Sequence, residues 1–172
     1  MWHFLCCFLR RLCIPAAFFI AAHANANAEH APQLYTDDEL VIIELVYGKQ
    51  TLNEAMQGYA GKYGLMLPLG GLAEALQFPI TVSAQEGQAE GWFLEESNTI
   101  TVDVPRGEAV IHGKKFHFSK EQAEAHSDDI YINADVLSQW FPLNFVFSFS
   151  TQKVDVRAKN NARLPLDTEA EK

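Results

Sequence analysis

The chain has 172 residues, of which 13 are basic and 22 are acidic, and its formal net charge is −9. This length allows one compact domain or two small ones. The acidic balance argues against nucleic acid and anionic lipid as partners, because binding phosphate requires a basic surface.

Residues 1–28 have the layout of a secretory signal peptide. An arginine pair precedes the short apolar run 12–22, and the small-residue stretch ANANA ends at Ala28. This order predicts cleavage after Ala28, with Ala26 as the second choice. The alternative is a membrane anchor, but the apolar run is shorter than the roughly 20 residues that span a bilayer.

All three cysteines, Cys6, Cys7 and Cys13, lie inside the predicted signal peptide. The mature chain would have no thiol, which excludes a disulfide framework and a thiolate metal site. Losing two arginines with the signal leaves 11 basic and 22 acidic residues, a net charge of −11. We expect a bacterial envelope protein that resides in the periplasm or at the outer membrane. No later apolar run is long enough to span a membrane.

The mature chain would open with a lead-in, residues 29–43, whose polar part before residue 40 we expect to be flexible. Residues 40–48, LVIIELVYG, are apolar and predict a strand. An alternative for the lead-in is a short helix that begins at a Thr36 cap, with Glu39 completing a capping box.

An internal repeat follows. The stretch 65–82, LMLPLGGLAEALQFPITV, has its large apolar residues where 130–147, IYINADVLSQWFPLNFVF, has them 65 positions later. The equivalent core positions are Leu67 and Ile132, Leu72 and Leu137, Leu76 and Phe141, and Ile80 and Phe145. One offset kept without a gap predicts a duplicated structural unit.

Each unit reads as a strand, a short helix and a β-hairpin. The first strand, 65–69 or 130–134, would direct alternate residues to one side. The helix that follows has apolar residues four apart, which share a helix face, and Asn133 or Asp135 can cap the second helix. The remaining predicted elements are helices 70–76 and 134–141, strands 80–84, 89–95, 144–150 and 153–158, and three short strands within 98–119 with turns at 105–107 and 113–114.

We therefore predict an α+β, mainly β protein in which two similar strand–short helix–β-hairpin units, about 45–92 and 110–157, pack together. The predicted organisation is a signal peptide 1–28, a lead-in 29–43, a two-repeat domain 44–158 (units 44–93 and 110–158, connecting strands 94–109) and a linker-like tail 159–172.

The sequence offers no catalytic residue, no cofactor loop and no metal site that we would propose. The nucleotide and phosphate loops and the common hydrolase motifs are absent from the sequence. His112 and His117 are the best metal candidates, but they flank a predicted turn and need a third ligand. The acidic pairs 95–96 and 128–129 lie at loop ends, where solvated carboxylates are expected.

Aromatic residues offer a second kind of site. Trp92 and Phe93 are candidates for binding a partner, because aromatic side chains are enriched at interface hot spots. Trp140 precedes a core-facing residue of the second helix, and we expect it in the core.

Several stretches together resemble a known family: YGLMLPLGGLAEALQFPITV, then GQAEGWFLEESNTITVDVPRGEAVIHGK, then DDIYINADVLSQWFPLNFVFSFSTQKVDVRA and LPLD. In order and spacing they resemble the N-terminal periplasmic region of outer-membrane ushers, from about residue 44 to 167. The repeated unit also resembles the modules called copper amine oxidase N-terminal-like, a name that does not imply copper.

The resemblance implies a non-catalytic module for recruitment or assembly, whose partners are periplasmic chaperone–subunit complexes of pilus biogenesis. In that family a pore-forming β-barrel follows the LPL element, whereas this sequence ends at Lys172. The chain would then be a truncated or split usher, or a free-standing relative. The alternatives are a module that binds cell wall or glycan and a small periplasmic hydrolase.

Overall fold

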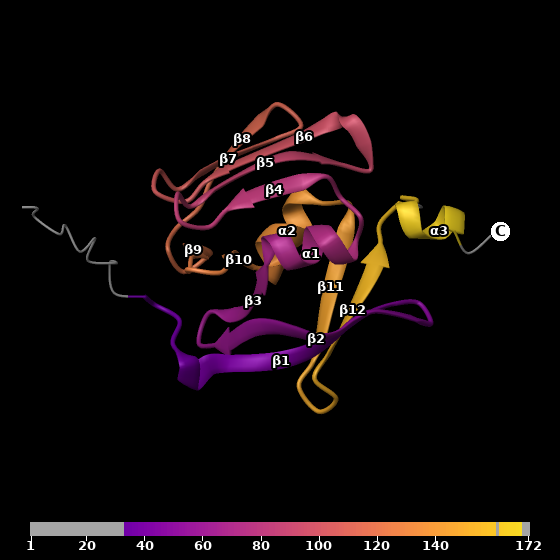
Figure 1. Cartoon of the computed structure of the whole chain (residues 1–172), viewed down its shortest axis with the longest axis horizontal. Helices are drawn as coiled ribbons and strands as arrows, with labels where there is room; N and C mark the ends of the chain where they lie inside the picture. The colour runs from indigo at the N-terminus through magenta and orange to yellow at the C-terminus, as the bar shows by residue number, and fades with distance from the viewer. Residues whose placement is uncertain (1–32, 161, 170–172) are drawn as a thin grey trace, which may run out of the picture. The chain divides into compact units, whose positions relative to one another are not determined.

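Two β-sheets enclose two short helices in the computed structural model of this chain (Figure 1). The structure describes residues 33–160 and 162–169, so the predicted signal peptide lies outside the described residues. The described part belongs to one compact unit, Ala31–Lys172. Its composition of two sheets and few helices confirms the predicted fold class, α+β and mainly β.

The seven-stranded sheet has the order β11-β12-β1-β2-β3-β10-β9. Its neighbours are antiparallel except β1 and β12, which run parallel. Its strands are β1 (Leu40–Tyr47), β2 (Gln50–Gly61), β3 (Gly64–Pro68), β9 (Ala123–Ala125), β10 (Ile130–Asn133), β11 (Leu143–Ser148) and β12 (Lys153–Ala158).

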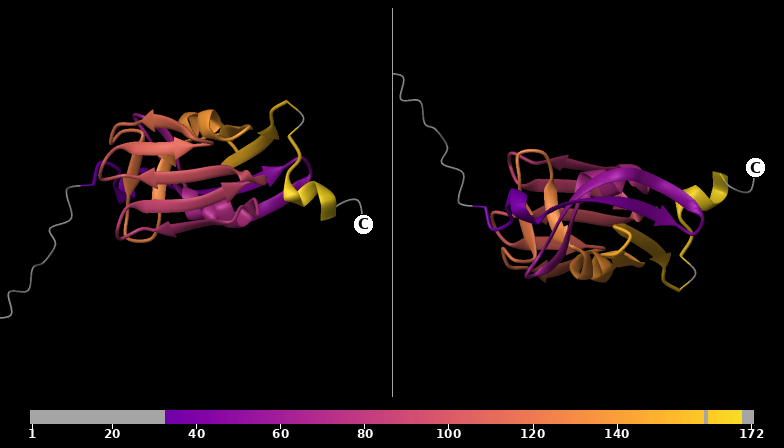
Figure 2. Two further views of the ribbon diagram at one scale, coloured as in Figure 1. Left: turned by 90° about the horizontal axis from the view of Figure 1, so that it is seen from above. Right: turned by 90° about the horizontal axis from the view of Figure 1, so that it is seen from below.

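The five-stranded sheet is antiparallel throughout and keeps the strands in chain order, β4-β5-β6-β7-β8. Its strands are β4 (Ile80–Ser83), β5 (Gln88–Phe93), β6 (Glu95–Asp103), β7 (Glu108–Ile111) and β8 (Lys114–His117). Seen from above, its outer face is turned to the viewer in Figure 2.

The two helices between the sheets are α1 (Leu69–Ala75) and α2 (Ala134–Trp140). Helix α2 is capped by Asn133, whose side chain accepts a hydrogen bond from the backbone N–H of Asp135 at 2.9 Å. Helix α1 lacks a side-chain cap of its own. Instead, the carboxylate of Asp129 accepts from the N–H groups of Gly70 at 2.8 Å and Gly71 at 3.0 Å. The second repeat therefore caps the helix of the first.

The duplication is visible in the pairing of the strands. The hairpin β4–β5 pairs Val82 with Ala89, and the hairpin β11–β12 pairs Phe147 with Val154, which are the same positions 65 residues later. The two hairpins nevertheless lie in different sheets. The units are thus interlocked, because the hairpin of the second unit extends the sheet formed by the first strands of the chain.

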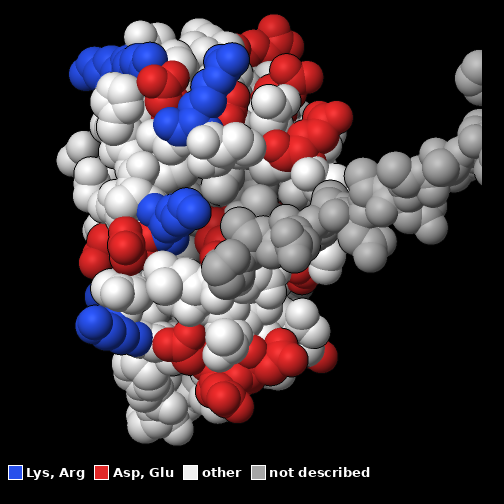
Figure 3. Space-filling view, turned by 90° about the vertical axis from the view of Figure 1, so that its left-hand side faces the viewer, with Lys and Arg blue, Asp and Glu red and all other residues white. Residues whose placement is uncertain are grey.

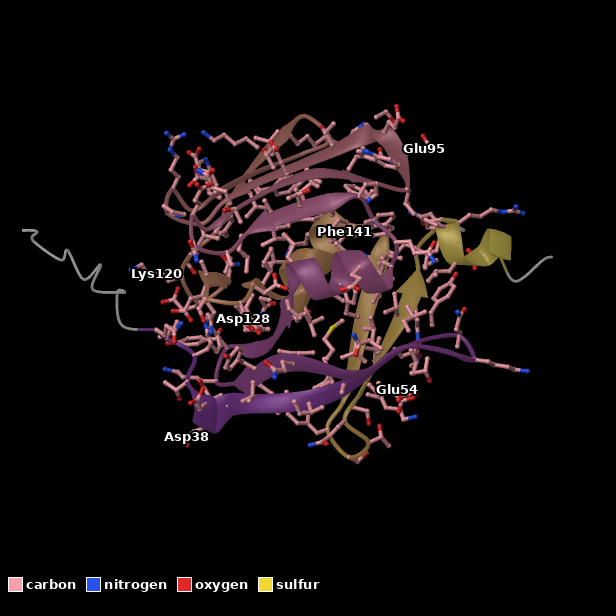
Figure 4. The ribbon with its side chains drawn as sticks, in the orientation of Figure 1. Asp38, Glu54, Glu95, Lys120, Asp128 and Phe141 are labelled. Atoms are coloured by element: carbon pink, nitrogen blue, oxygen red, sulfur yellow. The ribbon has the colours of Figure 1, made fainter. Side chains whose placement is uncertain are left out.

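The main core fills the space between the sheets and around the helices. Leu72 and Leu137, the equivalent helix residues, are both fully buried. Ile80 is half-buried at the edge of this core. The other predicted repeat positions are buried: Leu67, Leu76, Ile132, Phe141 and Phe145. Figure 4 places Phe141 between α1 and the five-stranded sheet, where its ring meets those of Phe78 and Phe93.

A second, smaller core lies on the other face of the seven-stranded sheet. It consists of Tyr35, Tyr59, Met66 and Tyr131, with buried His126 beside them. Because cores cover both faces, all of β3 except its first residue is buried. The predicted alternation is confirmed, since Leu65 and Leu67 face the main core, while Met66 between them faces the smaller core.

Both ends of the described chain are more ordered than we predicted. In the lead-in, Asp37–Glu39 form the short helix that was the alternative for this stretch, of the 3-10 type, and Thr36 precedes it without a side-chain cap. The tail was predicted to be linker-like, but it contains α3 (Pro165–Glu169) and buries Leu164 and Leu166 against the main core. Within the described residues, no helix is long and apolar enough to cross a membrane.

Candidate functional site

The outer side of β11 is the candidate site, because this strand ends the seven-stranded sheet and no strand of the described residues pairs with its outer edge. The N–H of Lys159 donates to the carbonyl of Pro142 at 2.8 Å, and these residues continue the register of β11 with β12. Bonded pairs alternate along an antiparallel ladder. The backbone groups of Leu143, Phe145 and Phe147 therefore point away from β12, toward the open edge.

This edge carries no charge. Residues 143–152 contain neither an acidic nor a basic residue and no proline. Val146 is 43% exposed and Phe149, in the following turn, is 74% exposed. The rings of Phe147 and Phe149 meet edge to face, with centroids 4.5 Å apart. Proteins commonly protect an open edge with charges, proline or a covering segment, so an exposed apolar edge of this kind suits strand addition.

The other three sheet edges are less suited to accept a strand. Strand β8 has four residues and carries Lys114, Lys115 and His117. Strand β9 has three residues and lies beside the lead-in, because the carboxylate of Glu124 accepts from the N–H groups of Leu34 and Tyr35. Strand β4 is uncharged but has only four residues. Strand β11, with six residues, is the longest of the four.

The two aromatic residues predicted to bind a partner lie on opposite faces of β5. Phe93 is 4% exposed and packs on Phe78 and Phe141 in the main core, so it offers no surface to a partner. Trp92 pairs with Thr99 of β6 and lies half-buried on the outer face. Trp140 is buried against Phe118, where the sequence placed it in the core.

The histidine and acidic candidates remain dispersed. His112 lies in the exposed turn between β7 and β8, and His117 approaches the carboxylate of Glu108 at 3.8 Å. Among the described residues, no group of three or more His, Cys, Asp or Glu side chains could hold a metal ion. In Figure 4, Glu95 lies at one end of the five-stranded sheet, far from the labelled Asp128.

Asp128 and Asp129 make structural contacts. Asp128 accepts a hydrogen bond of 2.6 Å from the hydroxyl of Tyr131. Burial raises the pKa of Asp129, although hydrogen bonds from the N–H groups of Gly70, Gly71 and Ile130 act to lower it. The aspartate pair thus closes one end of α1 and one side of the smaller core.

The smaller core holds a chain of polar contacts that sequence reasoning missed. The two ring nitrogens of His126 lie 3.1 Å from the hydroxyl of Tyr59 and 3.0 Å from the carboxylate of Glu124. Burial raises the pKa of Tyr59 and raises that of Tyr35 to about 12, with the carboxylates of Glu39 and Glu124 adding to the shift at Tyr35. A tyrosine held in its neutral form is not an activated nucleophile.

A shallow hollow of about 430 Å³ lies on the outer face of the five-stranded sheet. Across it, the register places Thr81, Glu90 and Thr101 in one row, and Trp92 follows Glu90 on the same face. Its acidic residues are Glu86, Glu90, Asp103 and Glu108, and Arg106 is its basic residue. At the neighbouring end of the molecule, acidic and basic side chains lie side by side (Figure 3).

Comparison with models of protein families, with curated proteins and with solved structures found no match to this chain. Sequence reasoning did not single out β11 as an edge, because the order of strands depends on long-range pairing. The uncharged run 143–152 was the available signal.

Proposed function

We propose that this chain is a non-catalytic module of the cell envelope that recruits a protein partner by adding a strand of that partner to β11. The observation that carries the proposal is the uncharged, unpaired edge whose backbone groups at Leu143, Phe145 and Phe147 point outward. A partner strand would bond to these groups, and its apolar side chains would cover Val146 and Phe149.

The partner class follows from the resemblance to ushers, in which subunits arrive from periplasmic chaperones. We propose that the protein resides in the periplasm and binds chaperone–subunit complexes, which offer extended strands. An apolar edge within an acidic protein selects such a partner by shape and backbone pairing rather than by charge.

The test compares two variants at one position. Phe147→Pro removes an N–H that points to the open edge and leaves the bonds to β12 in place, whereas Phe147→Ala removes the ring and keeps that N–H. Purified protein is mixed with chaperone–subunit complexes of its own organism, and co-elution is measured. We expect Phe147→Pro to abolish capture and Phe147→Ala only to weaken it.

Three further substitutions serve as controls for other surfaces. Alanine at His112, His117 or Glu95 should leave capture unchanged, because these residues lie on or beside the other sheet. Capture that survives Phe147→Pro would contradict strand addition. A metal-dependent hydrolysis lost with either histidine would contradict a non-catalytic function.

The second candidate function is glycan binding, favoured by the hollow with Trp92 beside it. Hydroxyl, amide and carboxylate groups on a sheet face can bond sugar hydroxyls, and an aromatic ring can cover a sugar face. Retention on insoluble peptidoglycan that is lost with Trp92→Ala, but kept with Phe147→Pro, would favour this alternative.

A further inference from the structure

We propose that the open edge of β11 pairs antiparallel with the same edge of a second copy of this chain, so that two seven-stranded sheets join into one. This inference goes beyond the proposed function, because it names a first occupant of the edge that a recruited strand would displace. It follows from the direction of the backbone groups and from the sequence of the edge.

The side-chain pattern fixes the register. Residues opposite each other in an antiparallel pair point to the same face, and Leu143, Phe145 and Phe147 supply the outward backbone groups. A two-fold axis at Val146 places Val146 opposite itself and Phe145 opposite Phe147 of the second copy. In this register, each exposed apolar residue of the edge lies opposite an apolar residue of the second copy.

The rest of the edge agrees with this register. Asn144 falls opposite Ser148 of the second copy, a polar pair, and Phe149 falls beside Leu143 of the second copy. The pairing is isologous, since the same patch is used by both copies, and it closes at two chains.

The lack of charge along β11 favours this edge as the surface through which two copies associate. The chain has a net charge of −9, so copies repel each other over most orientations. Residues 143–152 are uncharged, and Arg157 and Asp155 of the adjacent strand neutralise each other at 2.7 Å. No charge of one copy then faces a like charge of the other across the paired edges.

A pairing of six-residue strands is small. Stable interfaces bury at least about 1,200 Å², and one added strand contributes only part of that area. We therefore expect a weak dimer that dissociates on dilution, which leaves the edge free for a partner strand.

Cysteine cross-linking tests the register. In the full chain with Cys6, Cys7 and Cys13 changed to Ser, no other cysteine remains. Val146→Cys then places two thiols in a non-hydrogen-bonded pair with Cα atoms about 4.5 Å apart, within disulfide range. Asn144→Cys is the control, because its two copies lie about 13 Å apart along the strands. We expect mild oxidation to cross-link only the first variant.

Light scattering at several concentrations tests the dimer itself. The protein with its natural edge should approach twice the mass of one chain at high concentration. The Val146→Asp variant should remain monomeric, because two carboxylates would meet on the two-fold axis. Ile42→Asp is the matched control: Ile42 is 45% exposed on β1 of the same sheet, away from the edge, and should still dimerise. Circular dichroism checks that each variant is folded.

The outcomes separate the two proposals. The pairing with a second copy is overturned if the mass is that of a single chain at every concentration, or if both cysteine variants cross-link equally. If that monomer still captures chaperone–subunit complexes, the proposed function stands. Cross-linking through Val146→Cys alone supports the pairing. If the dimer forms but the diluted, monomeric protein captures no complex, the proposed function falls while the dimer stands.

Discussion

Leu67 and Ile132 lie directly opposite each other where β3 and β10 pair, and they are also equivalent residues of the two repeats. On either side of them, Pro68 pairs with Tyr131 and Met66 pairs with Asn133. Met66 is the repeat equivalent of Tyr131, and Pro68 is the repeat equivalent of Asn133, so exchanging the two repeats turns one pair into the other. A local two-fold axis therefore passes between Leu67 and Ile132. The two halves of the chain meet at this axis.

The repeat predicts matched losses of stability. Leu72→Ala and Leu137→Ala should each lower the free energy of unfolding by about 2–5 kcal/mol, because each leaves a cavity in the main core. Urea unfolding measures the loss. Glu74→Ala and Gln139→Ala, exposed on the same helices, should change stability by less than about 0.5 kcal/mol. If one leucine could be removed without loss, the helices would not be equivalent.

The lead-in should contribute to stability through one side chain. Tyr35→Ala should lower the free energy of unfolding by about 3–5 kcal/mol, because its ring fills the smaller core. Tyr35→Phe removes only the hydrogen bond from its hydroxyl to the carbonyl of Glu121 and should cost about 1 kcal/mol. Thermal unfolding of both variants provides the comparison, and equal losses would mean that the ring contributes nothing.

In the hairpin turns of the two repeats, substitutions at equivalent positions should change the free energy of unfolding in opposite directions. Gly87 and Gln152, 65 positions apart, both have positive φ, +65° and +52°. Gln152→Gly should raise the free energy of unfolding by up to about 1 kcal/mol, since glycine adopts this conformation without strain. Gly87→Ala should lower it by about 1–3 kcal/mol, because the added Cβ would lie 2.9 Å from Pro105. Chemical unfolding measures both, and a loss at Gln152→Gly would contradict the prediction.

Burial of Asp129 predicts a dependence of stability on pH. Its pKa is raised in the folded state, so the folded chain binds the proton more tightly than the unfolded chain. The cost of the buried charge is absent below the unfolded pKa, about 3.9, and grows as pH rises through the folded pKa. The stability of the natural chain minus that of Asp129→Asn should therefore fall as pH rises above about 4. A difference that increases with pH would mean that the three N–H donors outweigh burial.

Local patterns in the sequence predicted most of the elements but not their partners. Strand β2 (Gln50–Gly61) was missed because its glycine, alanine and amide residues lack the alternation of a strand, and its pairing with β1 and β3 imposes the extended conformation. Phe93 faces the main core because it lies on the same side of β5 as the buried Ala89, four positions earlier. Proposing Phe93 as a surface residue overlooked this alternation.

The candidate site, too, could be predicted only in part from local sequence patterns. The run 143–152 displays its lack of charge in the sequence, but whether it is an edge depends on which strands flank it. The tail 159–172 has no periodicity and mixes charges, which is typical of a linker, yet its Leu164 and Leu166 are buried. Two contacts with a distant core are invisible to a search for periodicity.

The parallel pairing of β1 and β12 constrains the order of folding. Glu44 aligns with Lys153, 109 positions later. The pairing of β1 with β12 therefore cannot form until the last strand of the sheet is available. Closing so long a loop costs entropy before the pairing can stabilise it, which slows folding. A chain that emerges N-terminus first, from a ribosome or a translocation channel, therefore exposes one side of β1 until residue 158 has followed. A chaperone that shields an extended strand would act during that interval.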